Sequence, residues 1–316
     1  MTNWGYKAVR KVLQTFGGAE LAQQQSGRIT GEPGNPEVAT LDLSAPVALF
    51  GRVQKNYFYV GNGSGGDVSA PYSINLVQGL VNAGVQLDST VLAAYESWCT
   101  ASVNDPDPGF WGHWPRYYAE MPVKQDWVQA AAKRCQTAVV VIGRSAGEDR
   151  ENTLKKGSFY LTNKEKALLD AVTTAFQKVV LVLNIGSIMD FAEIDAYGDK
   201  ISAILLAWQL GMESGNAVAD VLTGQVNPSG RLTDTIAKTY ADYPAQNFGN
   251  KAENRYTEDI FVGYRYFETF APERVLYPFG YGLSYTDFAC KVTKTETKDQ
   301  TVTVQVQVEN IGALSG

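Results

Sequence analysis

The sequence lacks the long apolar segments that cross membranes or direct secretion. No apolar run approaches the roughly 18 residues needed to span a bilayer, and the N-terminal MTNWGYKAVRKVLQTF has no apolar core like that of a signal peptide. Cysteine is scarce, because Cys99, Cys135 and Cys290 are the only three and lie far apart in the sequence. We therefore expect no disulfide framework, no cysteine metal site, no membrane partner and, by default, a cytoplasmic location.

Positive charge and histidine are also in short supply. The 27 Lys and Arg residues are outnumbered by 33 Asp and Glu, and no basic cluster is visible, so nucleic acid is not an expected partner. His113 is the only histidine and cannot build a metal site alone. We expect no metal and no cofactor. Aromatic residues, in contrast, make up 11% of the chain, and their faces suit sugar rings.

The middle of the sequence alternates apolar strand patterns with helical patterns of about ten residues. The strand patterns lie at 46–52, 137–143, 178–186 and 201–209, and the helical patterns lie at 74–85, 89–99, 126–135, 164–176, 188–197 and 213–224. Such alternation indicates βαβ units and a mostly parallel sheet with helices on both faces. The predicted fold is a flavodoxin-like, three-layer α/β sandwich, which we assign to residues 46–285.

The two ends of the chain differ from this middle part. Residues 1–45 are predicted to form an N-terminal helix and a linker that contains Gly and Pro. Near the C-terminus the pattern changes to a period of two, as in TVTVQVQVEN (301–310), so residues 286–316 are assigned to the first strands of a β-sandwich. Two strands are too few for such a module, so we expect the chain to be part of a longer protein or one piece of a two-piece protein.

A polar cluster follows the strand pattern at 137–143, in VVVIGRSAGEDREN (139–152). Ligands bind at the carboxyl ends of strands in open α/β sheets, so Glu148, Asp149 and Arg150 are candidates for a reactive group. The alternative is a solvated turn, which the charge pattern alone favours.

Several motifs resemble the C-terminal α/β-sandwich domain of glycoside hydrolase family 3, which includes many β-glucosidases. The motifs are VGYRYFET (262–269), LYPFGYGLSYTDF (276–288), GMESGNAVADVLTGQVNPSGRLTDT (211–235), GNGSGGDVSAPYS (61–73) and AVVVIGRSAGEDREN (138–152). The resemblance covers roughly residues 46–316, and its last part is similar to the start of the fibronectin-III-like domain of this family. The family's E-G-x-V-L-L-K-N pattern before the first strand is missing.

The resemblance implies a retaining β-glycosidase that acts on terminal β-linked sugars. In this family a (β/α)₈ barrel supplies the nucleophilic aspartate, and we expect it beyond Gly316, as in the rearranged branch, or on a partner fragment. The N-terminal MTNW resembles the nucleophile's T-D-W setting, but Asn3 carries an amide, which cannot attack a sugar. The chain alone is therefore expected to be inactive. The competing hypothesis is a non-catalytic carbohydrate-binding or scaffold module.

The resemblance places Glu148 at the position of the general acid/base, with Asp149 as the alternative. Retaining hydrolysis needs two carboxyl groups about 5 to 5.5 Å apart, and Glu148 would be one of them. The loop is expected to swing over the active site of a neighbouring domain, where apolar surroundings would raise the pKa of Glu148, as a general acid requires. If the residue is structural instead, Glu148 caps the backbone or pairs with Arg150.

The remaining site candidates lie in two loops. In this family the glycine loop lines the sugar entrance, so Ser64 and Asp67 are candidate substrate-binding residues. Phe110 and Trp111 lie in the long loop predicted at 105–122 and form either a platform for the aglycone, together with Trp114, or plain packing. Arg150 is expected to orient its loop or to bind a carboxylate. The exposed edges of the terminal strands favour self-association, so a homo-oligomer is a further expected partner state.

Overall fold

The computed structural model describes residues 40–66, 68–107, 109–148, 150–247 and 252–316. Most of the predicted N-terminal helix and linker therefore lies outside the described residues. The chain divides into two compact units, and among the described residues the first contains 40–226 and the second 227–316. The assigned domain boundaries stay a prediction.

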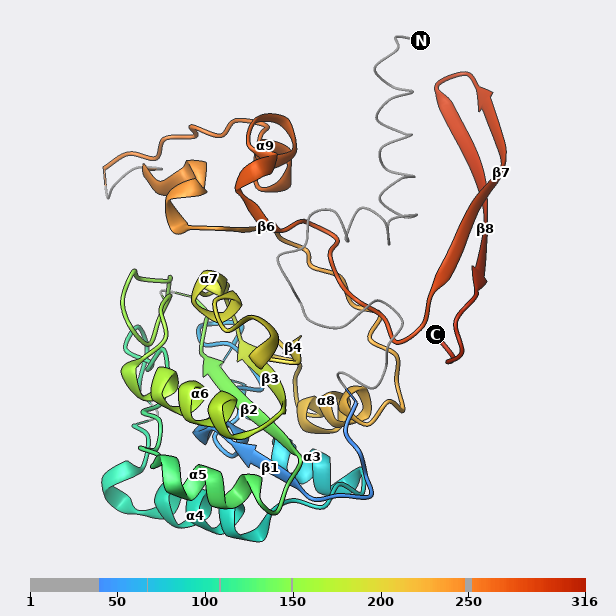
Figure 1. Cartoon of the computed structure of the whole chain (residues 1–316). Helices are drawn as coiled ribbons and strands as arrows, with labels where there is room; N and C mark the ends of the chain where they lie inside the picture. Colours follow the sequence, from blue (N-terminus) through green and yellow to red (C-terminus); the bar gives the residue numbers. More distant parts are fainter. Residues whose placement is uncertain (1–39, 67, 108, 149, 248–251) are drawn as a thin grey trace. The chain divides into compact units, whose positions relative to one another are not determined.

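The first unit is built on a four-stranded parallel sheet with the order β1-β2-β3-β4. The strands are β1 (Val47–Phe50), β2 (Thr137–Arg144), β3 (Lys178–Ile185) and β4 (Ala203–Leu206). They are continuous apolar runs rather than alternating ones, because helices cover both faces of the sheet. In Figure 1 they run side by side through the centre of this unit.

Helices form the two outer layers of the first unit, at the places where the sequence predicted them. They are α3 (Leu76–Asn82), α4 (Ser89–Thr100), α5 (Gln125–Ala132), α6 (Asn163–Ala175), α7 (Phe191–Asp195) and α8 (Ser214–Leu222). Helices α3 and α8 pack together so closely that a Cβ on Gly79 would lie 2.0 Å from the carbonyl oxygen of Gly215. Helix α6 begins with a capping box between Thr162 and Glu165.

The two faces of the sheet have separate apolar contacts. Leu49, Val141 and Val182 pack into one buried cluster with side chains of α3 and α8. Phe50 points to the other face, where its ring lies 5.7 Å from that of Trp127 and 5.9 Å from that of Phe176, both nearly perpendicular. The three-layer α/β sandwich predicted from the sequence is confirmed (Figure 1).

The second unit has less regular structure. It contains β5 (Ile236–Ala237) paired with β6 (Val275–Tyr277), and α9 (Tyr264–Phe270), which the sequence patterns did not predict. Strands β7 (Phe288–Lys298) and β8 (Thr301–Asn310) form the antiparallel hairpin that the alternating pattern predicted.

Short 3₁₀ helices complete the described elements. They span Arg52–Gln54, Ser102–Asn104, Gly198–Lys200, Tyr240–Asp242, Pro244–Asn247 and Pro272–Arg274. Within the described ranges, no helix combines the length and the apolar character that crossing a membrane requires.

Candidate active site

The glycine loop after β1 and the loop after β2 meet beyond the carboxyl ends of the two strands. The backbone N–H of Asn62 donates to the carbonyl of Ala146 at 2.9 Å, and the N–H of Glu148 donates to the carbonyl of Asn62 at 3.2 Å. Gly147 has φ of 153°, and a Cβ there would lie 2.1 Å from the Asn62 carbonyl oxygen. Only glycine permits this parallel bridge, which fixes the position of Glu148 relative to the glycine loop.

Glu148 is held by a single residue of the glycine loop. Its Oε2 accepts hydrogen bonds from the backbone N–H of Ser64 at 2.9 Å and from the Ser64 hydroxyl at 2.6 Å. The glycine loop can approach Glu148 closely because residue 63 has no side chain. A Cβ on Gly63 would lie 2.5 Å from the Cβ of Glu148. The structure thus brings together two of the predicted site residues, Glu148 and Ser64. Within the described part of the chain, Glu148 makes no ion pair with Arg150.

The environment of Glu148 in this chain is exposed and polar rather than apolar. The side-chain and backbone hydrogen bonds from Ser64 lower the pKa of Glu148, and the residue is exposed, so burial contributes little in the opposite direction. The expected raised pKa concerned the apolar surroundings of a neighbouring domain's active site, so it stays a prediction for the assembled enzyme. In this chain the carboxylate of Glu148 is held in the charged state.

A buried amide on strand β3 joins the loops that follow β1 and β4. Asn184, on β3, accepts a hydrogen bond from the N–H of Phe58 at 2.7 Å and donates to the Phe58 carbonyl at 2.9 Å and the Trp208 carbonyl at 2.6 Å. Trp208 has a positive φ of 38°, which is strained for a bulky residue. Sequence reasoning missed Asn184. The signal available was an amide inside an otherwise apolar strand.

A buried ion pair lies at the start of the loop that follows β2 and joins this loop to helix α6. Arg144, the last residue of β2, donates to both carboxylate oxygens of Glu165 at 2.7 and 2.8 Å, and its Nε donates to the Ser158 carbonyl at 3.0 Å. Both side chains are almost fully buried, with 2% and 5% exposure. Sequence reasoning did not single out Arg144 or Glu165. The spacing of Thr162 and Glu165 is that of a capping box and could have placed Glu165 at the start of α6.

In the aromatic loop predicted at 105–122, some rings are exposed as a ligand platform would be, and one ring is buried as packing. Phe110 and Trp111 are exposed, as a ligand platform requires, whereas Trp114 is buried and packs edge-on against Trp111 at 5.3 Å. The ring of His113 lies 4.5 Å from that of Phe110. Trp114 therefore anchors the loop, and the two exposed rings remain candidates for contact with a ligand.

The other sequence candidates are located as follows. Arg150 is half-buried, and its guanidinium donates to the Gly112 carbonyl over a long 3.4 Å, which links its loop to the aromatic loop. Asp67 and Asp149 lie outside the described residues. No group of three or more His, Cys, Asp or Glu side chains within the described ranges could hold a metal ion.

Comparison of the sequence with known proteins finds similarity to glycoside hydrolases of family 3. The family model described as the glycosyl hydrolase family 3 C-terminal domain matches residues 40–285. A β-glucosidase of Ruminococcus albus is 44% identical over 283 residues, which cover 89% of this chain and 30% of that protein. Beta-glucosidase A of Butyrivibrio fibrisolvens is 38% identical over 278 residues, with 79% and 32% covered. The chain spans about a third of the length of these two relatives.

Solved structures show the same similarity in three dimensions. A β-glucosidase from Paenibacillus barengoltzii matches with a TM-score of 0.84 and 40% identity, covering 89% of this chain and 31% of that one. Beta-glucosidase 3B from Thermotoga neapolitana, in a complex with glucose, matches with a TM-score of 0.78 and 34% identity, covering 89% and 40%.

Proposed function

This chain belongs to glycoside hydrolase family 3, and from that premise we propose that Glu148 is the general acid/base of a retaining β-glycosidase. The proposed substrates are glycosides with a terminal β-linked sugar, glucose or xylose. The nucleophilic carboxylate would come from a barrel domain or fragment outside this chain. The chain alone would then be inactive, because retaining hydrolysis needs both carboxyl groups.

The observation that supports this proposal best is the fixed contact between Ser64 and Glu148. Two hydrogen bonds of 2.9 and 2.6 Å orient one exposed carboxylate at the carboxyl edge of the sheet, where ligands of α/β proteins bind. The hydrogen bond from the Ser64 N–H would also suit a glutamate that only caps the backbone, so the exposure of the carboxylate, and not the contact alone, favours a catalytic role. An exposed, oriented carboxylate is available to a substrate.

The lowered pKa of Glu148 suits the second half of the reaction, in which the glycosyl-enzyme intermediate is hydrolysed. After the glycosyl-enzyme intermediate has formed, the acid/base must accept a proton from the attacking water, so it must be charged. The hydrogen bonds from Ser64 stabilise that charged form. In the first half it must donate a proton to the leaving oxygen. We propose that contact with the barrel and the substrate removes water from Glu148 and raises its pKa for that step.

Replacing Glu148 tests the assignment by its dependence on the leaving group. In the complete enzyme, Glu148→Gln should slow hydrolysis of glycosides with poor leaving groups by about 10² to 10⁴-fold, and should affect activated aryl glycosides much less in the first step. Azide should partly restore turnover and give a glycosyl azide of retained configuration, because an anion needs no general base to attack the intermediate.

The neighbouring carboxylate provides the control. Asp149→Asn removes the same charge one residue away and should show neither the leaving-group dependence nor the azide rescue. If Asp149→Asn shows both while Glu148→Gln behaves like the wild type, the acid/base is Asp149. If the complete protein releases no phenol from any aryl β-glycoside, the proposed activity is wrong and the chain is better explained as a non-catalytic module.

A further inference from the structure

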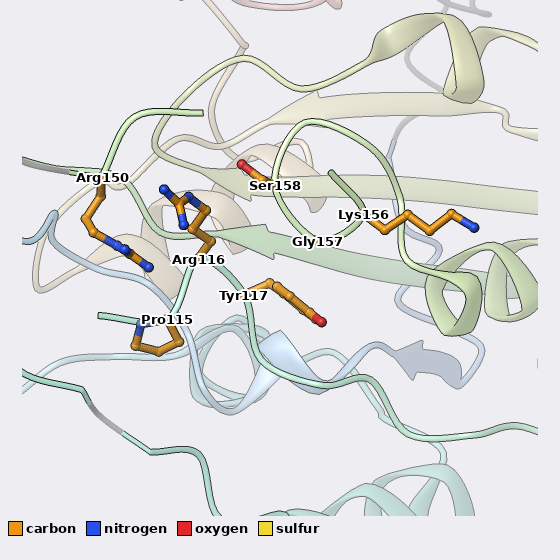
Figure 2. A pocket seen from close by; sticks show the side chains of 7 residues that line it. All are labelled: Pro115, Arg116, Tyr117, Arg150, Lys156, Gly157 and Ser158. Carbon is orange, nitrogen blue, oxygen red and sulfur yellow. The ribbon is translucent and has the colours of Figure 1, made fainter. Parts of the chain in front are cut away.

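An open pocket lies on the loop that carries Glu148. Its volume is about 200 Å³, and it is lined by Pro115, Arg116, Tyr117, Arg150, Lys156, Gly157 and Ser158. Figure 2 shows the side chains of Arg116 and Arg150 beside each other, whereas Lys156 extends away from them. Three of the seven lining residues carry positive charge and none carries negative charge. This is unusual in a chain with a net charge of −6.

The cations of this pocket have no carboxylate partner in the described part of the chain. Arg116 donates from Nε and Nη2 to the backbone carbonyl of Glu151, both at 3.1 Å, and Lys156 donates to the side-chain amide of Asn163. The Nε of Arg150 is buried without any hydrogen-bond partner among the described residues. A buried guanidinium N–H without an acceptor is unfavourable, so an acceptor from outside the chain would stabilise it.

The charged groups around Arg150 indicate that a ligand accepting this hydrogen bond would be negatively charged. Burial and the neighbouring Arg116 lower the pKa of Arg150, and the nearby Glu151 offsets this only in part. A bound anion would relieve the repulsion between the two guanidinium groups. A carboxylate suits them better than a neutral group does, because a planar guanidinium fork can donate two parallel hydrogen bonds to it.

The position of the pocket indicates which part of a substrate it would meet. Arg150 follows Glu148 by two residues, and the N–H of Arg150 donates to the Gly147 carbonyl at 3.1 Å, which closes a turn around Glu148. Under the proposed function, Glu148 protonates the leaving group. A site on the same turn would therefore contact the leaving group rather than the sugar that is cleaved off.

We propose that Arg150 and Arg116 form a binding site for a carboxylate on the leaving-group side of the substrate. This inference rests on the proposed function for the identity of the ligand, but not for the existence of the anion site. The preferred substrates would then be β-glycosides whose aglycone bears an acid group, such as a phenolic acid or a uronic acid.

The anion site can be tested on the 316-residue chain without catalysis. NMR titration should show that 4-hydroxybenzoate binds about tenfold or more tightly than its neutral amide, 4-hydroxybenzamide, and that added salt reduces this preference. Arg150→Gln should abolish the preference. Arg265→Gln removes the same charge from an exposed position in the other unit and should leave the preference unchanged.

Three results would overturn the anion site: equal affinity for acid and amide, no binding of the acid, or a preference that survives Arg150→Gln. If Arg150→Gln does not fold, as judged by circular dichroism, Arg116→Gln serves as the second variant and should give the same loss. These outcomes do not depend on whether the complete protein is a glycosidase.

The substrate assignment is tested on the complete enzyme. The ratio of kcat/KM for 4-carboxyphenyl and 4-carbamoylphenyl β-glucoside should fall about tenfold in Arg150→Gln relative to the wild type, because comparing the two enzymes removes the intrinsic difference between the leaving groups. If the chain binds 4-hydroxybenzoate but this ratio does not change, the anion site does not contact the leaving group, and the substrate assignment is wrong.

Discussion

Ser64 lowers the pKa of Glu148 in this chain through two hydrogen bonds to the same oxygen, Oε2. The larger of the two effects on the pKa of Glu148 comes from the Ser64 hydroxyl, and the smaller from the backbone N–H. Substitution of the side chain therefore removes the larger effect and leaves the smaller one in place.

Ser64→Ala is expected to raise the pKa of Glu148. A general acid is active while it holds its proton, so the alkaline limb of the kcat/KM profile of the complete enzyme should move to higher pH. Ser64→Thr keeps the hydroxyl and should restore the wild-type limb. The measurement is kcat/KM from pH 4 to pH 9 on a glycoside with a poor leaving group. An alkaline limb that stays in place in Ser64→Ala would show that the hydrogen bonds seen here are not kept in the assembled enzyme.

The residue-level assignments show what the sequence could and could not provide. Glu148 became a candidate because it follows a buried strand in a motif shared with a known family. Its contact with Ser64 could not be read from the sequence, since the two residues are 84 positions apart and meet only through the bridge between Asn62 and Gly147. The lowered pKa of Glu148 in this chain could not be predicted either, because it depends on the hydrogen bonds from Ser64 and on the exposure of the loop.

At the scale of elements, the buried pair Arg144–Glu165 joins strand β2 to helix α6. Replacing only Arg144 leaves the Glu165 carboxylate buried without a cation, with only the hydrogen bond from the Thr162 N–H at 2.7 Å, and breaking a buried pair in this way typically destabilises a protein by about 3 to 5 kcal/mol. Arg144→Met should therefore lower the free energy of unfolding in urea by that amount. The double variant Arg144→Met/Glu165→Met should lose much less than the sum of the two single variants.

An exposed ion pair supplies the matched comparison for Arg144→Met. Arg255 pairs with Glu253 on the surface, where both side chains are largely solvent-exposed. Arg255→Met should change the free energy of unfolding by less than about 1 kcal/mol. A loss of less than about 1 kcal/mol in Arg144→Met as well would contradict the structural role assigned to the buried pair.

The elements that the sequence predicted are those with one dominant physical signal. Strands β2 and β3 are long apolar runs, and β8 alternates without a break, so either pattern identifies them. Helix α9 was missed because it has only seven residues, four of them aromatic, and only Phe267 is buried. Its short turn of helix has no apolar stripe of helical period, and neighbouring aromatic contacts such as Tyr243–Phe267 stabilise it instead.

At the scale of the whole molecule, stability should depend on pH through Glu120. This glutamate is buried and accepts hydrogen bonds from the backbone N–H groups of Arg52 and Met121, at 2.8 Å each, and from the Tyr95 hydroxyl at 3.2 Å. Burial is the main cause that raises the pKa of Glu120 to about 7, although these hydrogen bonds oppose it.

Between pH about 4.5 and about 7, the folded chain therefore keeps a proton on Glu120 that the unfolded chain has released. The stability from this group is fully present below pH about 4.5, the ordinary value for a glutamate, and is lost as the pH rises through about 7. Glu120→Gln mimics the protonated form but loses one acceptor oxygen, so it should be less stable than the wild type at pH 5. That difference should shrink by pH 8.

Urea unfolding of both proteins at pH 5 and pH 8 measures this effect, because the other titrating groups are common to both and cancel in the difference. A gap in unfolding free energy that is the same at both pH values would mean that Glu120 is not protonated in the folded chain. Nothing in the sequence indicated this group, since a glutamate in a proline-containing loop is typically solvated.

The pairing of Arg144 with Glu165 also has a consequence for how the sequence can change over time. A lineage that replaced one partner first would have to persist with an unpaired charge in its interior, whereas a joint replacement by two apolar residues would lose the capping box and the bond to the Ser158 carbonyl but would bury no unpaired charge. In homologous proteins, positions 144 and 165 should therefore covary. An alignment in which one of the two positions varies freely while the other stays fixed would contradict this.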